Sequence, residues 1–103
     1  MARRLRWSPR ALDQVEALAD YIARSSGTYP SAVVRRIFDR ARGLPDQPGQ
    51  GRRVPEYDGA DEIREVFVQS WRMLYRVSGT EVLIVAVIHG ARQIGPSEID
   101  GAT

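Results

Sequence analysis

The most regular pattern of apolar and polar positions lies in the second half of the chain. Apolar and polar side chains alternate over residues 71–77, and an unbroken apolar run follows over residues 82–88. A period of two is typical of a strand with two different faces, and a short apolar run rich in β-branched side chains is typical of a strand covered on both faces. The sequence Ser-Gly-Thr at residues 78–80 predicts a turn between them. Residues 63–68 predict one more strand, with a weaker pattern.

Two antiparallel hairpins with two-residue loops at Ser70-Trp71 and Gly79-Thr80 would sort the side chains of these strands onto two faces. The first face would hold Val66, Val68, Met73, Tyr75, Val82, Ile84, Ala86 and Ile88. The second would hold Glu65, Phe67, Arg72, Leu74, Arg76, Leu83, Val85, Val87 and His89. A slip of one residue in either hairpin exchanges the faces, so the assignment depends on the register. The first face is purely apolar, whereas the second is an apolar floor edged by charged groups, and we expect it to be covered.

The first half of the chain predicts a strand and two helices. Alternation over residues 3–7 predicts a short strand. Ser8-Pro9 predicts the start of a helix, because serine is a preferred N-cap and proline suits the first helical position. Gly27 predicts the end of this helix, and a second helix is expected to start near Pro30 and to end at residues 43–45. The apolar stripes of the two helices would cover the first face of the sheet.

The order strand–helix–helix–strand–strand–strand predicts an α+β fold, with a helical hairpin packed on one face of a mainly antiparallel sheet. We expect a single domain over residues 1–92. Residues 45–61 are rich in proline and glycine and predict a loop long enough to be functional. Residues 93–103 predict a short polar C-terminal tail without assigned structure.

Composition excludes several classes of protein. With no cysteine and one histidine among 103 residues, disulfides and thiolate metal sites are excluded, and neither a metal site nor a cofactor is expected. No apolar run approaches the length of a membrane span, and the basic N-terminus lacks the apolar region of a secretory signal, so we expect a cytoplasmic protein. The net charge is only +2, yet all 15 basic residues are arginine. Arginine binds phosphates and carboxylates through a bidentate fork.

Short motifs spread over nearly the whole chain carry a family resemblance. They are Trp7-Ser8-Pro9, Asp20-Tyr21-Ile22-Ala23, Gly51-Arg52-Arg53-Val54-Pro55-Glu56, Ile63-Arg64-Glu65, Trp71-Arg72-Met73-Leu74-Tyr75-Arg76-Val77 and His89-Gly90-Ala91-Arg92. In this order and spacing, the chain resembles the RelE/ParE superfamily of toxins from bacterial type II toxin–antitoxin systems, often described as plasmid stabilisation proteins. The two motifs ending in Glu56 and Arg92 resemble the ParE-like branch more than the RelE-like branch. Trp71 stands where the family typically has a tyrosine.

The resemblance to the ParE-like branch implies a toxin that arrests growth by binding DNA gyrase and trapping its cleaved-DNA state. Such a toxin performs no chemistry, so no catalytic residue is expected. The residues expected to contact the target or phosphates are Arg52, Arg53, Arg72, Arg76 and Arg92.

The RelE-like branch implies a different activity, which is cleavage of mRNA on the ribosome. That chemistry needs a base, an acid and cations around one phosphate. The candidate set is Glu56, Arg72, Arg76 and His89, although the chain lacks the lysines and the C-terminal tyrosine of many such enzymes. The simpler interpretation of His89 is structural, and Glu65 opposite Arg76 would form a cross-strand ion pair. An inactive homologue that binds only its antitoxin is the third interpretation.

The family also implies a partner, a ParD-like or related antitoxin that forms a hetero-oligomer with the toxin. An acidic, amphipathic antitoxin segment would cover the second face of the predicted sheet while its carboxylates meet Arg72 and Arg76. The apolar side chains expected to contact it are Leu74, Leu83, Val85 and Val87.

Overall fold

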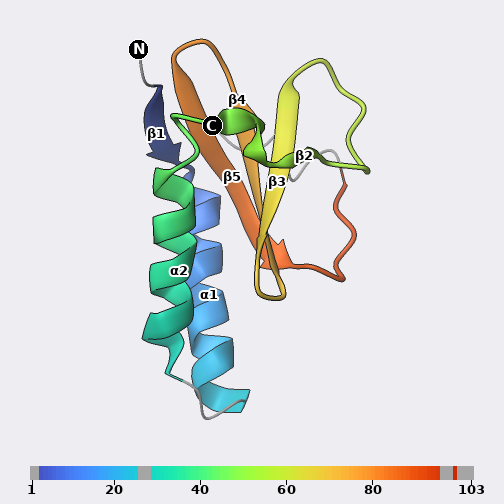
Figure 1. The fold of residues 1–103 in the computed structure, drawn as a ribbon. Coiled ribbons are helices and arrows are strands. Elements are labelled where there is room, and N and C mark those ends of the chain that lie inside the picture. The colour runs from blue at the N-terminus through green and yellow to red at the C-terminus, as the bar shows by residue number, and fades with distance from the viewer. Residues whose placement is uncertain (1–2, 26–28, 96–98, 100–103) are drawn as a thin grey trace.

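The computed structural model describes residues 3–25, 29–95 and 99, which form two helices packed on a five-stranded sheet. In chain order the elements are β1 (Arg4–Trp7), α1 (Pro9–Ser25), α2 (Pro30–Arg42), the 3-10 turn η1 (Pro48–Gln50), β2 (Arg52–Arg53), β3 (Glu62–Val68), β4 (Trp71–Val77) and β5 (Glu81–His89). The sheet order is β1-β5-β4-β3-β2, with β1 parallel to β5 and every other pair antiparallel. Figure 1 shows α1 and α2 side by side along one side of the sheet and the segment after β5 on the other. The predicted α+β fold is confirmed.

Ser8 joins the first strand, the first helix and β5. Its Oγ accepts the N–H of Ala11 at 3.1 Å, as an N-cap does, and donates to the carbonyl oxygen of Val85 at 3.3 Å. Pro9 occupies the first helical position, so the predicted start of α1 is confirmed. The predicted stop at Gly27 lies outside the described residues.

The two helices cover one face of the sheet and build the larger hydrophobic cluster. It contains Ala11, Val15, Leu18 and Ile22 of α1, Val33, Ile37 and Ala41 of α2, Leu44, and Val66, Val68, Met73, Tyr75, Val82, Ile84 and Val87 of the sheet. Trp7 packs on Phe38 at its border, with ring centroids 4.7 Å apart. Neither described helix is long and apolar enough to cross a membrane.

The β3–β4 hairpin turns one position earlier than predicted. Val68 pairs with Trp71, so Gln69 and Ser70 form the loop, and Gln69 has a positive φ of 54°. Met73 therefore stands opposite Val66, where the sequence placed Tyr75. Because this shift in pairing is an even number of residues, the side chains of β3 keep their predicted faces.

The β4–β5 hairpin contains a β-bulge that the sequence did not indicate. Tyr75 pairs with Ile84 as predicted, but its neighbour Leu74 pairs with Ala86, so Val85 is an extra residue in β5. One extra residue moves every later side chain of the strand to the opposite face.

The bulge corrects four face assignments at the end of β5. Ala86 and Ile88 belong to the cluster on the second face, whereas Val87 belongs to the cluster under the helices. His89 pairs with Trp71 and lies on the helix side. The prediction that Val87 and His89 lie on the second face is therefore wrong.

The second face is covered by other parts of the same chain. The predicted loop over residues 45–61 contains η1 and the edge strand β2, and it brings Val54 and Tyr57 against this face. Ile94 and Ile99 also pack there and are only 7% and 1% exposed, so the predicted polar tail supplies two core side chains. The side chains that they cover are Ile63, Leu74, Leu83, Val85, Ala86 and Ile88.

Candidate functional site

Arg72 is the centre of a buried charge network on the second face of the sheet. Its Nε and Nη2 donate to Glu65 Oε1 at 2.8 and 2.5 Å, and its Nη1 and Nη2 donate to the two carboxylate oxygens of Glu56 at 2.8 and 2.9 Å. Nη1 also donates to the carbonyl oxygen of Arg92 at 3.0 Å. One guanidinium thus joins β3, the loop after β2 and the segment after β5.

Glu65 is held from its other side by Arg52. The carboxylate of Glu65 is 0% exposed, and its Oε2 accepts from Arg52 Nε at 2.6 Å. The Arg52 guanidinium lies 5.7 Å from the ring centroid of Phe67, close enough for a cation–π contact, and its side chain is mostly exposed. Two arginines therefore compensate one fully buried carboxylate, the condition under which a buried charge is tolerated.

The structure corrects one predicted charge contact. Glu65 was expected to pair with Arg76, but it pairs with Arg72. Arg76 instead lies 3.5 Å from Asp61 Oδ2 and donates through Nη2 to the carbonyl oxygen of Ile99 at 3.3 Å. The reason is the shifted pairing of β3 with β4, which moves Arg76 away from Glu65.

Both members of the Arg72–Glu56 pair are held in their charged forms. Hydrogen bonds from Arg72 lower the pKa of Glu56 below its usual value, although partial burial opposes this. The hydrogen bonds from Glu56 raise the pKa of Arg72 in turn. The pair stays ionised at neutral pH, and it holds the loop after β2 against the second face of the sheet.

We expect Glu56→Gln to reduce the free energy of unfolding by about 1–2 kcal/mol at neutral pH, because a charge-assisted contact becomes a neutral one. The lowered pKa of Glu56 means that its contribution is full above the unfolded-state pKa and is lost as the pH falls through the native pKa. The difference between the variant and the wild type should therefore vanish under acid conditions. Urea unfolding of both proteins at neutral and acidic pH measures this, with Asp46→Asn at an exposed position as control. A difference that persists in acid would contradict the assignment.

His89 lies on the face opposite to Arg72. Its ring meets Trp71 edge-on, with centroids 5.5 Å apart, and its Nδ1 accepts the N–H of Ala91 at 3.2 Å. A neutral imidazole that accepts through Nδ1 carries its hydrogen on Nε2. No group of three or more His, Cys, Asp or Glu side chains in the described parts of the chain is placed to hold a metal ion.

The four candidate catalytic residues do not converge on one site. Glu56 and Arg72 neutralise each other, Arg76 contacts Asp61, and His89 is across the sheet. The β-bulge is the reason, because it turns the end of β5 toward the helices.

The arginines expected to contact a target differ in accessibility. Arg52 and Arg53 are exposed on the edge strand β2, and Arg92 is exposed after β5. Arg72 is buried and Arg76 is partly buried, so these two are less accessible than the other three.

The apolar residues expected to contact an antitoxin are also buried within the chain itself. Leu74, Leu83 and Val85 lie under the cover of the second face. Val87 is buried on the opposite side, beneath the helices. An antitoxin would reach the first three only by displacing that cover.

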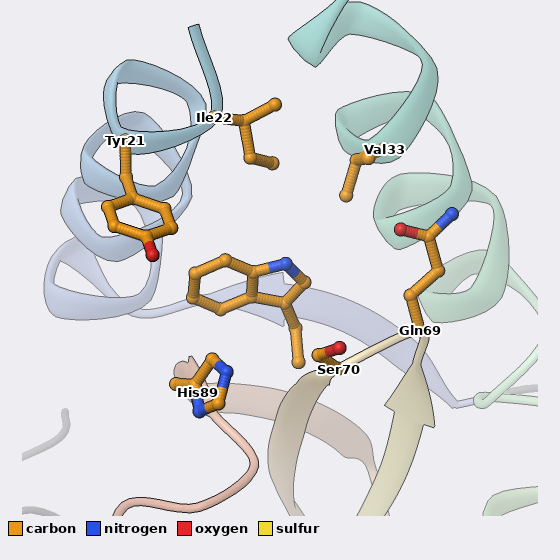
Figure 2. Close-up of a pocket in the computed structure, with 7 residues that line it drawn as sticks. Tyr21, Ile22, Val33, Gln69, Ser70 and His89 are labelled. Atoms are coloured by element: carbon orange, nitrogen blue, oxygen red, sulfur yellow. The ribbon is translucent and has the colours of Figure 1, made fainter. Parts of the chain in front are cut away.

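An open hollow that the sequence did not indicate lies between the two helices, the β3–β4 loop and the end of β5. It measures about 340 Å³ and is lined by Tyr21 of α1, Val33 of α2, Trp71 and His89. Figure 2 shows Tyr21, Val33 and His89 directed toward this space from three elements. Tyr21 is 61% exposed. The motif Asp20-Tyr21-Ile22-Ala23, which carries part of the family resemblance, is a sequence signal for this residue.

A family model described as the ParE toxin of the type II toxin–antitoxin system parDE matches residues 5–94. The chain belongs to the ParE toxin family. This confirms the family and the branch that the sequence motifs predicted. A toxin of this family has an antitoxin as its partner.

Two solved structures were compared with this fold. The chain is similar to a structure from the chromosomal ParDE toxin–antitoxin system of P. aeruginosa, with a TM-score of 0.66 and 20% identity over 85% of this chain and 96% of that chain. The YoeB dimer from Staphylococcus aureus matches with a TM-score of 0.46 and 11% identity, over 86% and 98% of the two chains. At 20% identity, the likeness to the ParDE structure supports the shared fold alone. No curated protein sequence matches this chain closely enough to count as a relative.

Proposed function

We propose that this ParE-family toxin arrests growth by binding DNA gyrase and holding its cleaved-DNA state, without chemistry of its own. A ParD-like antitoxin neutralises it in the cytoplasm by forming a hetero-oligomer. The observation that carries the choice of target is the separation of the candidate catalytic groups, with Arg72 paired to two carboxylates and His89 on the opposite face.

Cleavage of RNA sets a geometric requirement that this arrangement does not meet. An acid, a base and a cation have to reach the same phosphate. Here Glu56 and Arg72 neutralise each other, and neither shares a surface with His89. This supports a toxin that acts by binding over a ribosome-dependent mRNA endonuclease.

The exposed arginines supply the contact surface in this proposal. Arg52 and Arg53 on β2, with Arg92 after β5, meet acidic groups of gyrase or phosphates of its bound DNA. Arg72 and Arg76 contribute indirectly, because they hold the loop after β2 and the segment after β5 in place.

Expression of the toxin in cells that carry a reporter plasmid tests this function. We expect the plasmid to lose negative supercoils and to acquire gyrase-linked breaks, while the 5′ ends of cellular mRNAs stay unchanged. Arg53→Ala should weaken the effect about tenfold, as for an arginine at the centre of an interface. Arg36→Ala, an exposed arginine of α2, is the matched control. New mRNA ends with unchanged plasmid topology would contradict the proposal and point to the endonuclease, and no effect on either would point to an inactive homologue.

A further inference from the structure

Phe67 is a half-exposed aromatic side chain on the second face of the sheet. It stands opposite Arg72 of β4, two residues after Glu65, so it shares a face with the charge network. Its exposed fraction is 48%. The other large apolar side chains that are exposed in the described parts of the chain are Leu12, Tyr21 and Tyr29. None of these lies on a strand, so the cover of the second face leaves one aromatic ring of the sheet open to solvent.

Two neighbours hold the ring of Phe67 in place. The guanidinium of Arg52 lies 5.7 Å from its centroid. Gly90 lies so close to it that a Cβ there would stand 3.1 Å from Phe67 Cε2 and 2.9 Å from the carbonyl oxygen of Ser70. A single exposed apolar side chain is common on protein surfaces, but a ring held by its neighbours loses little conformational entropy when a partner binds.

Arg52 is fixed as firmly as the ring that it contacts. Its Nε donates to Glu65 Oε2 at 2.6 Å. The preceding residue, Gly51, donates its N–H to the hydroxyl of Tyr75 at 3.0 Å and accepts from Arg64 Nη1 at 2.8 Å. Within the described residues, Nη1 and Nη2 of Arg52 make no hydrogen bond, and the side chain is mostly exposed. Its outer end can therefore receive a carboxylate through two parallel hydrogen bonds.

We propose that Phe67 and Arg52 anchor the toxin on gyrase by receiving an acidic segment of the gyrase protein, and not its DNA. An apolar side chain of this segment packs on the exposed part of the Phe67 ring. An aspartate or glutamate next to it accepts hydrogen bonds from Nη1 and Nη2 of Arg52. The inference rests on the proposed function, because gyrase is the partner that it names.

The local charges favour a protein segment over DNA. The two arginines of the network, Arg52 and Arg72, are balanced by the carboxylates of Glu56 and Glu65. Binding to a phosphate backbone depends on basic side chains that exceed the acidic ones around them, and this network has no such excess. An aromatic ring beside an arginine is instead the combination that dominates the binding energy of protein–protein interfaces.

Titration calorimetry of purified toxin with gyrase in the absence of DNA tests the aromatic anchor. Phe67→Ala should weaken binding by about thirtyfold, the effect expected for an aromatic anchor, whereas Phe67→Tyr keeps the ring and should stay within about twofold of the wild type. Tyr29→Ala is the matched control, because it removes an exposed aromatic side chain next to α2, and it should bind like the wild type. Circular dichroism checks that each variant is folded at the temperature of the assay.

The same titration tests the arginine fork. Arg52→Lys keeps a positive charge beside Glu65 but cannot offer two parallel donors, so binding should weaken about tenfold. Arg36→Lys, at an exposed position of α2, is the control and should bind like the wild type.

A repeat of the titrations with gyrase bound to DNA separates the two partners. The losses should be of similar size with and without DNA, because the contact is with protein. A loss for Phe67→Ala that appears only when DNA is present would assign the ring to DNA and overturn the inference. Wild-type affinity for both Phe67→Ala and Arg52→Lys would also overturn it, and in both cases the proposed function stands. If the wild type binds gyrase neither with nor without DNA, the proposed function fails, and the inference fails with it.

Discussion

Replacing Arg72 with alanine will reduce the free energy of unfolding by about 3–5 kcal/mol, the cost typical of breaking a buried ion pair from one side. The variant leaves the fully buried carboxylate of Glu65 with only Arg52, and it leaves Glu56 without its partner. It also removes the donor to the carbonyl oxygen of Arg92, so the segment after β5 loses one of its links to β4. Equilibrium unfolding in urea measures the loss.

Arg72→Lys separates the charge of Arg72 from its geometry, and Arg53→Ala is the control. Arg72→Lys keeps the charge but cannot donate as a planar fork to two carboxylates, so its loss should lie between those of the wild type and the alanine variant. Arg53→Ala removes an exposed arginine from β2 and should change stability by no more than about 0.5 kcal/mol. A loss below about 1 kcal/mol for Arg72→Ala would contradict a central role for the network.

Leu74→Ala will reduce the free energy of unfolding by about 2–5 kcal/mol, as large-to-small changes in a closed core do. Leu74 is 0% exposed, and it is covered from β5, from the loop after β2 and from the segment after β5. The alanine leaves a cavity, because three separate parts of the chain would have to move together to fill it.

Leu12→Ala is the control for this prediction. Leu12 is 45% exposed on α1, so its removal should cost less than about 1 kcal/mol. Similar small losses for both variants would mean that the cover of the second face by other parts of the chain is not part of the stable fold.

Local patterns made the helices and most strands predictable. The start of α1 depends on Ser8 and Pro9 alone, since an N-cap and a first-turn proline act within one turn of the chain. The alternation through β4 placed Met73 and Tyr75 under the helices correctly. Such features need no knowledge of distant residues.

The register at the end of β5 was not predictable, because its sequence is apolar on both faces. A bulge is visible in a pattern only when a polar residue appears on the wrong side, and the run from Val82 to Ile88 has none. His89 is the first polar residue after the bulge. The bulge turns His89 toward the helices, whereas an unbroken register would have placed it on the same face as Arg72. The predicted nuclease set depended on this one position.

The charge network and the cover of the second face are formed by residues that lie far apart in the sequence. Glu56 reaches Arg72 from a loop whose path the sequence did not indicate, and Ile94 and Ile99 stand among polar residues. Only the folded arrangement shows that these segments return to the sheet.

The central claim is that the toxin acts on gyrase by binding, and an assay with purified components tests it most directly. Toxin is titrated into gyrase and relaxed plasmid with ATP, in the absence of ribosomes, and both supercoiling and cleaved DNA are measured. The account predicts that supercoiling stops and cleaved DNA accumulates as toxin is added. Unaffected gyrase at a large excess of toxin, together with cleavage of ribosome-bound mRNA by the same preparation, would contradict it.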